Sequence, residues 1–566
     1  MGNADEDMSS LISQFKKIVG KRHVLTSQNA TRRYRQGFRF GDGHVLAVVK
    51  PGSLLEQWQI LQQCIKTDVI IITQAANTGL TGGSTPDGDD YERPIVIINV
   101  MRIKKIQLIN DANQVICMPG ATLDQLEKKL KPLGKEPHSV IGSSCLGASV
   151  LGGICNNSGG SLVRRGPAYT ELALFAQRTK DGQLQLTNHL GIELGDTPET
   201  ILHHLECGQF GSISHDPNCC ASDHDYQEHV RDIDADSAAR FNADPRRLHE
   251  ASGCAGKLMV FAVRLDTFAA ETQTQVFYIG TNDAIVLEHL RRHMLKHFSS
   301  LPVSGEYIHH DAYNIAEHYG KDTFLLINWL GTRRLPLFFA LKSRIDGFLS
   351  QFNKRPSHVT DRILQKVSQW FPSHLPKRMQ NYRDRFEHHL LLKMSDSGID
   401  EAREFLTAFF TEHRGEFFEC TPDEGKKAFL HRFATAGAAV RYRAVHPDTV
   451  EDIVALDIAL KRNEQNWQEH LPDSLDQQIL VKLYYGHFFC HVFHQDYVIR
   501  KGANCLEIEH QMWQLLDNRG AQYPAEHNVG HLYQAKPELA KFYQQLDPCN
   551  RFNPGIGQTS KKHHWS

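Results

Sequence analysis

An apolar run, Val69-Ile-Ile-Ile-Thr73, is followed by the loop sequence Ala75-Ala-Asn-Thr-Gly-Leu-Thr-Gly-Gly-Ser-Thr-Pro86. We expect the run to form a buried strand and the loop to carry almost no side-chain bulk. Backbone N–H groups in such a loop can approach a ligand closely. Because the loop offers hydroxyl and amide donors without a fixed positive charge, it predicts one side of a pyrophosphate-binding site.

A second glycine-rich segment follows further along the chain. Its sequence is Gly142-Ser-Ser-Cys-Leu-Gly-Ala-Ser-Val-Leu-Gly-Gly-Ile-Cys-Asn-Asn-Ser-Gly-Gly-Ser161. Two such loops predict the two sides of one large nucleotide cofactor. The first loop lacks the G-x-G-x-x-G spacing and precedes no helical pattern, which argues against the dinucleotide fold of nicotinamide enzymes.

The segments around these loops predict alternating strands and helices. Apolar runs at 45–49, 94–99 and 114–118 are expected to be strands, and Ser53 and Thr122 are expected to cap helices. A further buried strand is expected at the end of 253–265. The chain has 566 residues, which exceeds what one core supports, so we expect two to four domains.

Composition limits the function classes. The chain is 41% hydrophobic with a formal charge of −2, which argues against a dedicated nucleic-acid-binding protein. Its 12 cysteines are scattered, as in a protein with reduced thiols. No apolar run approaches the length of a bilayer-spanning helix.

Residues 331–388 are locally basic. They contain 12 Lys or Arg against four acidic residues, interleaved with aromatic residues such as Trp370 and Phe371. This mixture favours the interface of an anionic membrane. A solvated basic surface and a nucleic-acid contact are the alternatives.

Reactive side chains gather near the C-terminus. One segment contains His487 and His494 in a strand-like run, and another contains the adjacent pair Glu526 and His527. Imidazoles with a carboxylate suit proton abstraction or a metal-assisted site. A second possible metal cluster, Cys219, Cys220, His224 and His229, matches no zinc spacing. It lies in 205–250, which lacks periodicity and is expected to be a surface insertion.

Four ordered motifs resemble the vanillyl-alcohol-oxidase-type FAD domain. They are the two glycine-rich loops, Gly253–Leu265 and the terminal Asp547-Pro…Asn553-Pro-Gly555. The phrases Glu136-Pro-His-Ser-Val-Ile-Gly-Ser-Ser144 and Tyr523-Pro-Ala-Glu-His-Asn-Val-Gly-His531 extend the likeness. Over its whole length the chain resembles the respiratory quinone-dependent D-lactate dehydrogenases.

The resemblance implies an α+β fold with three parts. A two-subdomain FAD-binding domain would span 1–266 and be completed by 521–566. An α+β cap domain over the flavin would comprise 267–325 and 389–520. A basic, aromatic membrane-binding segment would span 326–388.

The resemblance also implies a noncovalently bound FAD, since neither loop contains a histidine. The implied cofactor-binding residues are Ala75, Ala76, Asn77, Thr78, Gly79, Gly83, Ser84, Gly142, Ser149, Gly159 and, through its backbone, Val260.

For the chemistry, the resemblance implies that His527 is the base, with Arg432 as the first and Arg441 as the second candidate for the substrate carboxylate. His487, His494 and Glu526 correspond to the ligands of a divalent metal in related enzymes. This chain has Phe-Phe-Cys-His-Val-Phe at 488–493 where those enzymes have a glycine-rich acidic turn, so the metal stays open.

The implied reaction is oxidation of D-lactate to pyruvate, with hydride transfer to FAD and electron transfer to ubiquinone or menaquinone. The implied location is peripheral, on anionic phospholipid at the cytoplasmic face of the bacterial inner membrane, without nucleic acid as a partner. Three alternatives remain: a related dehydrogenase of D-2-hydroxyglutarate or glycolate, a flavin-binding protein without turnover, and a nucleic-acid-associated protein.

Overall fold

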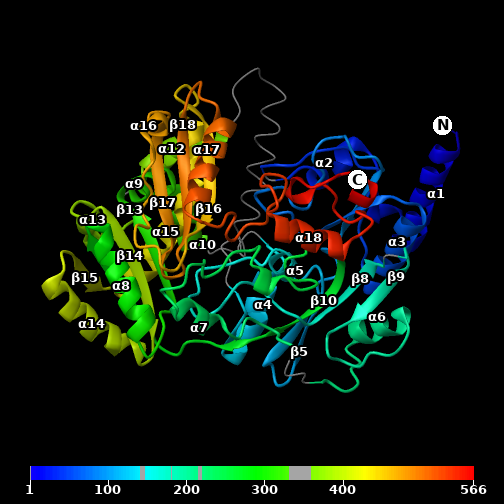
Figure 1. Ribbon diagram of the computed structural model, residues 1–566, viewed down its shortest axis with the longest axis horizontal. Helices are drawn as coiled ribbons and strands as arrows, with labels where there is room; N and C mark the ends of the chain where they lie inside the picture. Colours follow the sequence, from blue (N-terminus) through cyan, green and yellow to red (C-terminus); the bar gives the residue numbers. More distant parts are fainter. Residues whose placement is uncertain are drawn as a thin grey trace.

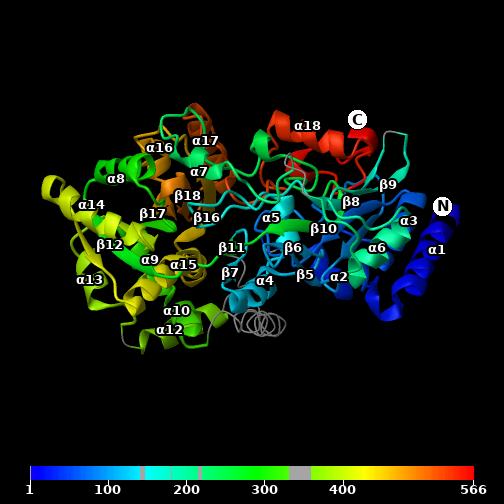
Figure 2. The same cartoon turned by 90° about the horizontal axis from the view of Figure 1, so that it is seen from below.

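The computed structural model describes residues 2–37, 39–139, 147–179, 181–214, 219–330, 359–371 and 373–565. They form two lobes (Figures 1 and 2). One lobe is built on a four-stranded and a five-stranded sheet, and the other on a seven-stranded sheet. Helices pack on all three sheets, so the predicted α+β class is confirmed. Within the described residues, no helix is both long and apolar enough to cross a membrane.

The four-stranded sheet has the order β1-β2-β4-β3. β2, β4 and β3 are parallel and fully apolar at their centres, as expected for strands covered on both faces. The predicted cap at Ser53 is confirmed, because its side chain accepts a hydrogen bond from the Glu56 N–H. The elements are α1 (Gly2–Val19), β1 (Val24–Leu25), α2 (Gln28–Arg35), β2 (Ala47–Val49), α3 (Leu54–Lys66), β3 (Ile70–Gln74) and β4 (Ile95–Asn99).

The five-stranded sheet is antiparallel, in the order β5-β6-β10-β8-β9. Its central strand, β10, is the strand predicted after Gly253. The elements around it are β5 (Ile106–Ile109), β6 (Gln114–Cys117), α4 (Leu123–Leu130), β7 (Lys135–Glu136), α5 (Val150–Cys155), β8 (Ala173–Arg178), β9 (Leu184–Asn188), α6 (Pro198–Cys207), β10 (Met259–Asp266) and β11 (Phe268–Ala269).

The C-terminal segment returns to this first lobe. α18 (Pro537–Leu546) lies there in Figure 1, and Phe552 forms a bridge with Ile71 of β3. The Asn553 side-chain amide donates to the carbonyls of Gly83 and Ala255, at 2.8 Å each. The end of the chain is therefore bonded to the first glycine-rich loop.

The seven-stranded sheet of the second lobe is antiparallel, in the order β15-β12-β14-β13-β17-β18-β16. Along its strands, alternate residues point into two different hydrophobic cores, one on each face of the sheet. One face is covered by α8, α14 and α17, and the other by α9, α10, α13 and α15. The strands are β12 (Thr274–Thr281), β13 (Ser304–His309), β14 (His388–Ser395), β15 (Glu416–Glu419), β16 (Val450–Ala459), β17 (Ile479–His487) and β18 (Val492–Arg500). The helices are α8 (Ala284–His297), α9 (His310–Tyr319), α10 (Lys321–Leu330), α12 (Val359–Gln369), α13 (Lys377–Arg383), α14 (Gly398–Glu412), α15 (Pro422–Val445), α16 (Asp473–Asp476) and α17 (Cys505–Asn518).

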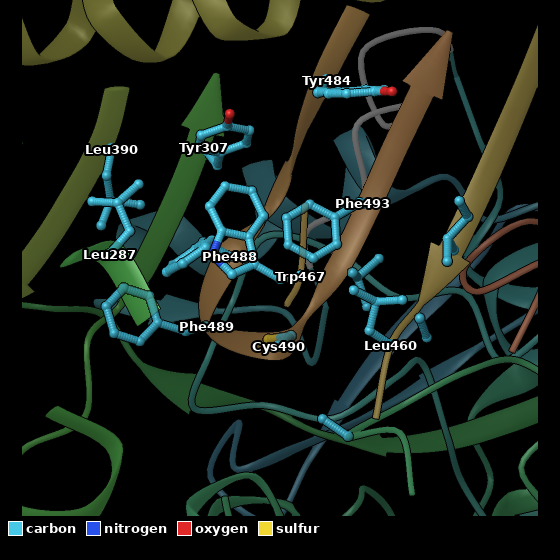
Figure 3. Packing of buried hydrophobic residues seen from close by; sticks show 14 of the residues in the cluster. Leu287, Tyr307, Leu390, Leu460, Trp467, Tyr484, Phe488, Phe489, Cys490 and Phe493 are labelled. Atoms are coloured by element: carbon cyan, nitrogen blue, oxygen red, sulfur yellow. The ribbon is translucent and has the colours of Figure 1, made fainter. Parts of the chain in front are cut away.

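An aromatic core fixes the turn between β17 and β18 (Figure 3). Trp467 stacks on Phe493 with ring centroids 5.5 Å apart and packs edge-on against Phe488 and Tyr307. His491 at the turn has φ 52° and is fully buried. The strand-like run predicted between His487 and His494 is therefore wrong: a tight turn separates them.

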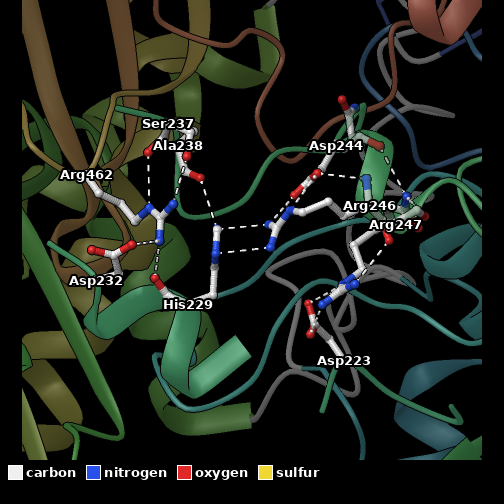
Figure 4. Close-up of polar contacts among 11 residues, drawn as sticks. Asp223, His229, Asp232, Ser237, Ala238, Asp244, Arg246, Arg247 and Arg462 are labelled. Carbon is white, nitrogen blue, oxygen red and sulfur yellow. Dashed lines mark hydrogen bonds and ion pairs between the residues drawn. The ribbon is translucent and has the colours of Figure 1, made fainter. Parts of the chain in front are cut away.

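Within the segment 205–250, residues 226–244 do not form the predicted surface insertion, whereas the described residues 206–214 are mostly exposed. Tyr226 and Val230, both in α7 (Tyr226–Arg231), are buried in the core of the second lobe. Ion pairs and side-chain hydrogen bonds fix the irregular backbone around them (Figure 4). Arg246 pairs with Asp244 and contacts both ring nitrogens of His229. Burial and then Arg246 lower the pKa of His229 to about 4, so this ring stays neutral near pH 7.

Candidate active site

Strand register places two histidines opposite two acids. In the sheet order β13-β17-β18-β16, Glu306 pairs with His487 and Asp457 pairs with His494. Directly paired residues on antiparallel strands bring their side chains together on one face. The His487 Nδ1 lies 2.6 Å from Glu306 Oε1, and the His494 Nδ1 lies 3.4 Å from Asp457 Oδ1.

Glu526 completes this group from the loop before α18. Its Oε2 lies 3.2 Å from His487 Nε2 and 3.9 Å from His494 Nε2, while its Oε1 accepts from Arg240 at 2.8 Å. One ligand atom from each of His487, His494 and Glu526 lies within 4.8 Å of the others. Each histidine holds an acid on its second nitrogen, the outer-shell arrangement usual for metal-bound imidazole. The donor set therefore fits a divalent cation.

Charges in the group compensate each other. Burial works against a charged His487, but the carboxylates of Glu306 and Glu526 outweigh it and raise its pKa to about 10. Burial would raise the pKa of Glu526, but His487 and Arg240 lower it to about 2. The carboxylates of Glu306 and Glu526 thus place negative charge around His487, where it can stabilise either a proton on the imidazole or a metal cation.

His527 is oriented by the neighbouring Asp457. This carboxylate accepts the backbone N–H groups of Glu526 and His527 at 2.7 and 2.9 Å, and its Oδ2 lies 3.4 Å from His527 Nδ1. Burial would raise the pKa of Asp457, but His527 and His494 hold it well below its usual range. The His527 side chain is 37% exposed, so its ring is accessible while its backbone is fixed.

The two candidate arginines lie in different surroundings. Arg432 Nη2 pairs with Glu306 Oε2 at 3.0 Å, and its guanidinium carbon lies 4.5 Å from the centre of the Tyr485 ring. Its Nε is buried and makes no hydrogen bond to the described residues. Arg432 is therefore connected to His487 through Glu306 and keeps donor capacity.

Arg441 instead binds two carboxylates away from this group. Its Nη2 lies 2.7 Å from Asp322 Oδ2 on α10, and its Nε lies 2.7 Å from Asp361 Oδ1 on α12. Both edges of the guanidinium are in use. The structure therefore gives Arg441 a structural pairing, and we do not retain it as a candidate for the substrate carboxylate.

The first glycine-rich loop folds against the segment that carries His527. Asn528 contacts Thr81 through a side-chain hydrogen bond, and a Cβ at Gly83 would clash with the Asn528 amide. Asn77 has φ 54° and donates to the Gln36 carbonyl at 2.9 Å. Asn528, which contacts the first glycine-rich loop, thus directly follows the candidate base His527 in the chain.

The remaining predicted cofactor residues have the following places. Ala75, Ala76, Thr78 and Gly79 continue the loop after β3, and Ser84 donates to the Asn77 side chain at 3.2 Å. Ser149 caps α5, and a Cβ at Gly159 would clash with the Glu526 carboxylate. Val260 lies in β10 beside a break in the β8 register, and its carbonyl accepts from Gln57 at 3.2 Å. Gly142 lies outside the described residues.

Four residues of the site were missed at the sequence level: Glu306, Asp457, Arg240 and Asn528. One of them carries a usable signal, because Asp457 is an acid inside an apolar stretch of strand sequence, whereas Glu306 lies in the mixed sequence Ser304-Gly-Glu-Tyr-Ile-His309. A buried acid in such a strand needs a partner. Arg240 and Asn528 carry no comparable signal.

Two family models match the chain. Residues 45–180 match the family model "FAD binding domain", and residues 276–565 match "D-lactate dehydrogenase, membrane binding". The fold is similar to that of p-cresol methylhydroxylase, with a TM-score of 0.60 at 12% identity over 98% of this chain and 97% of that one. It is also similar to 4-ethylphenol oxidase from Gulosibacter chungangensis, with a TM-score of 0.56 at 12% identity over 98% of this chain and 97% of that one. These two structures show a likeness of fold alone.

Sequence relatives are much closer. The quinone-dependent D-lactate dehydrogenase of Escherichia coli strain K12 is 59% identical over 99% of this chain and 98% of its own length. The quinone-dependent D-lactate dehydrogenase of Haemophilus influenzae is 58% identical over 99% of this chain and 100% of its own length. The mitochondrial D-2-hydroxyglutarate dehydrogenase of Arabidopsis thaliana is 29% identical over only 36% of this chain and 35% of its own. The chain therefore belongs to the quinone-dependent D-lactate dehydrogenase family.

Proposed function

We propose that this protein oxidises D-lactate to pyruvate with FAD and passes the electrons to a membrane quinone. The reaction class is supported by the high sequence identity to members of the family over nearly the full length of the chain. The observation that carries the site is the short segment Glu526–Asn528, which joins an oriented histidine to the glycine-rich loop of the FAD-binding domain. When bound, FAD would supply the acceptor for the hydride that leaves the substrate Cα.

Each side chain has a role in this proposal. Arg432 binds the substrate carboxylate, because a guanidinium matches a carboxylate in charge and in planar geometry. His527 takes the proton of the substrate hydroxyl as general base. Asp457 orients His527 and stabilises the imidazolium that results. The proposed cofactor-binding residues are the predicted ones: Ala75, Ala76, Asn77, Thr78, Gly79, Gly83, Ser84, Gly142, Ser149, Gly159 and Val260.

A divalent cation is part of the proposal as a bound group of the site. His487, His494 and Glu526 would hold it, with Glu306 and Arg240 as outer partners. Its chemistry there would be Lewis acidity toward an oxygen of the substrate. Metal analysis of the purified protein, before and after dialysis against a chelator, tests this part separately.

The proposal also includes domain limits and a location. We propose an FAD-binding domain at 1–266 completed by 521–566, a cap at 267–325 and 389–520, and a membrane-binding segment at 326–388. The membrane-binding family model supports peripheral attachment. We further propose anionic phospholipid at the cytoplasmic face of the bacterial inner membrane as the surface, and ubiquinone or menaquinone as the acceptor.

The test is anaerobic addition of L-lactate and then D-lactate to the purified, flavin-containing protein. Bleaching of the flavin by the D form alone is the expected result. If D-2-hydroxyglutarate or glycolate bleaches the flavin faster than D-lactate does, that compound would take the place of D-lactate as the proposed substrate. A preparation that binds no flavin would contradict the proposal as a whole.

A further inference from the structure

α12 is a helix with its polar side buried and its apolar side exposed. Asp361, Gln365 and Ser368 are 6%, 5% and 3% exposed. Ile363 and Val367 are 54% and 39% exposed, and Trp370, which directly follows the helix, is 85% exposed. Both sets have the i, i+4, i+7 spacing of a single helix face. A helix on a protein in water has the opposite arrangement.

Specific polar contacts hold α12 in this orientation. Asp361 accepts from Arg441 of α15 at 2.7 Å, and the same guanidinium pairs with Asp322 of α10. Gln365 donates to the His318 carbonyl at 2.8 Å. Rotating the helix by half a turn would break these contacts and leave the buried Arg441 without Asp361. The polar contacts of the fold therefore fix which face of the helix is exposed.

The apolar face continues onto α10. Trp329 is 63% exposed, and its ring lies 5.8 Å from that of Phe371, which is 40% exposed. We call Trp329, Ile363, Val367, Trp370 and Phe371 the apolar patch. These are five of the ten large apolar side chains that are exposed in the described residues. α10 and α12 lie together at one edge of the second lobe (Figure 2).

Basic side chains accompany the patch. Lys366 is exposed on α12 next to Val367, and Arg362 lies next to Ile363. Asp322 and Asp361, acids of the same two helices, are both paired with the buried Arg441. The outer surface therefore presents tryptophan and aliphatic groups together with the exposed Lys366, while Arg362 is only partly exposed and its Nε is buried. This combination suits the boundary between anionic headgroups and acyl chains.

We infer that the apolar patch enters the headgroup–acyl boundary of a lipid bilayer, so that membrane attachment is hydrophobic as well as electrostatic. The inference rests on the proposed membrane association and adds the residues and the mode of contact. It commits to lipid because the helix is inverted and carries an exposed lysine beside its apolar face, and because the membrane-binding family model covers it. Salt weakens contacts with charged headgroups but not burial of the patch.

The test uses the full-length flavin-containing protein and vesicles of phosphatidylcholine with and without phosphatidylglycerol. In a triple variant, Ile363→Ser, Val367→Ser and Trp370→Ser, vesicle partitioning in high salt should fall by about tenfold or more. The matched control is Leu506→Ser, which removes an equally exposed apolar side chain on α17, 61% exposed. Brominated lipids should also quench tryptophan fluorescence less in Trp370→Phe than in the wild type.

Three outcomes would overturn the inference. The first is complete release of the wild type from anionic vesicles by high salt. The second is equal partitioning of the triple variant and the Leu506→Ser control. The third is a vesicle-free dimer of the wild type that the triple variant abolishes, since the patch would then bind a second copy. Flavin bleaching by D-lactate, measured in the same samples, reports on the proposed reaction independently.

Discussion

At the scale of single residues, the site depends on acids that face histidines. Asp457 fixes the backbone of Glu526 and His527 and lies beside the ring of His527. Glu306 lies between His487 and Arg432. Each acid removes freedom from a side chain that the proposed chemistry needs in one orientation, which is how a preorganised site avoids reorganisation during reaction.

His527→Gln should lose substrate oxidation but keep the cofactor. Removing a general base lowers rates by roughly 10² to 10⁴. We expect a fall of that size in the rate of anaerobic flavin reduction by D-lactate, measured by stopped flow, with unchanged FAD content. His510→Gln, at an exposed histidine of α17, is the control. A His527→Gln rate within a few-fold of the wild type would place the base elsewhere.

Glu509 makes stability depend on pH. Burial, opposed by Arg39 and reinforced by Asp452, raises its pKa from 4.5 to about 7. The folded chain thus keeps a proton that the unfolded chain releases between these values. The contribution of this group to the free energy of unfolding therefore falls by at most roughly 3 kcal/mol as the pH rises from about 4.5 to 7. It stays at this lower value above pH 7.

Glu509→Gln removes this loss, so its free energy of unfolding in urea should exceed that of the wild type at pH 8. The two proteins should converge as the pH approaches 4.5. Glu507→Gln, at an exposed acid of the same helix, should show no such convergence. An equal difference between Glu509→Gln and the wild type at both pH values would contradict the assignment.

At the scale of elements, sequence patterns predicted what is local and missed what depends on pairing. The capped helix after Ser53 and the strands around the first loop are confirmed, because caps and apolar runs act over a few residues. The turn between His487 and His494 was missed, because its aromatic residues face the core around Trp467 rather than continuing a strand. Glu306 and Asp457 join the site only through strand register, which a single sequence does not contain.

α15 connects two functions along one helix. Arg432 near its middle reaches Glu306 of the candidate active site, while Arg441 two turns later holds α10 and α12. The sequence motif around both arginines suggested the same role for each. Their partners separate them, because Arg441 finds two carboxylates that lie far away in sequence.

Exchanging each arginine should separate these roles. Arg432→Met should raise KM for D-lactate by about 10- to 100-fold, the value of a hydrogen bond to a charged group. Arg441→Met should leave KM unchanged and instead expose α10 and α12 to proteolysis, because it leaves two buried carboxylates without their cation. Asp361→Asn provides a milder second variant with the same expected direction. Equal increases in KM for both arginine variants would return Arg441 to the substrate site.

At the scale of the whole molecule, the two lobes meet in the segment Glu526–Asn528, which carries the candidate base. Glu526 contacts histidines of the seven-stranded sheet, and Asn528 contacts the first glycine-rich loop. The end of the chain is bonded to the same loop through Asn553. A ligand held by the loop therefore stabilises contacts that both lobes share.

FAD should accordingly stabilise the whole chain, and Gly79→Val should abolish that effect without weakening the apoprotein. A Cβ at Gly79 would have only the Asn528 amide within 4 Å, at 3.9 Å, so there is room at this atom, and we expect the valine methyl groups to extend into the space predicted for the cofactor. Adding FAD to wild-type apoprotein at a hundredfold excess over Kd should contribute about 2.7 kcal/mol. Calorimetry would show this as a higher Tm for one joint transition of both lobes. Gly437→Ala, at a glycine of α15 with open space around it, should keep the full shift. A full shift in Gly79→Val, or a lower apoprotein Tm in that variant, would contradict the assignment of this loop.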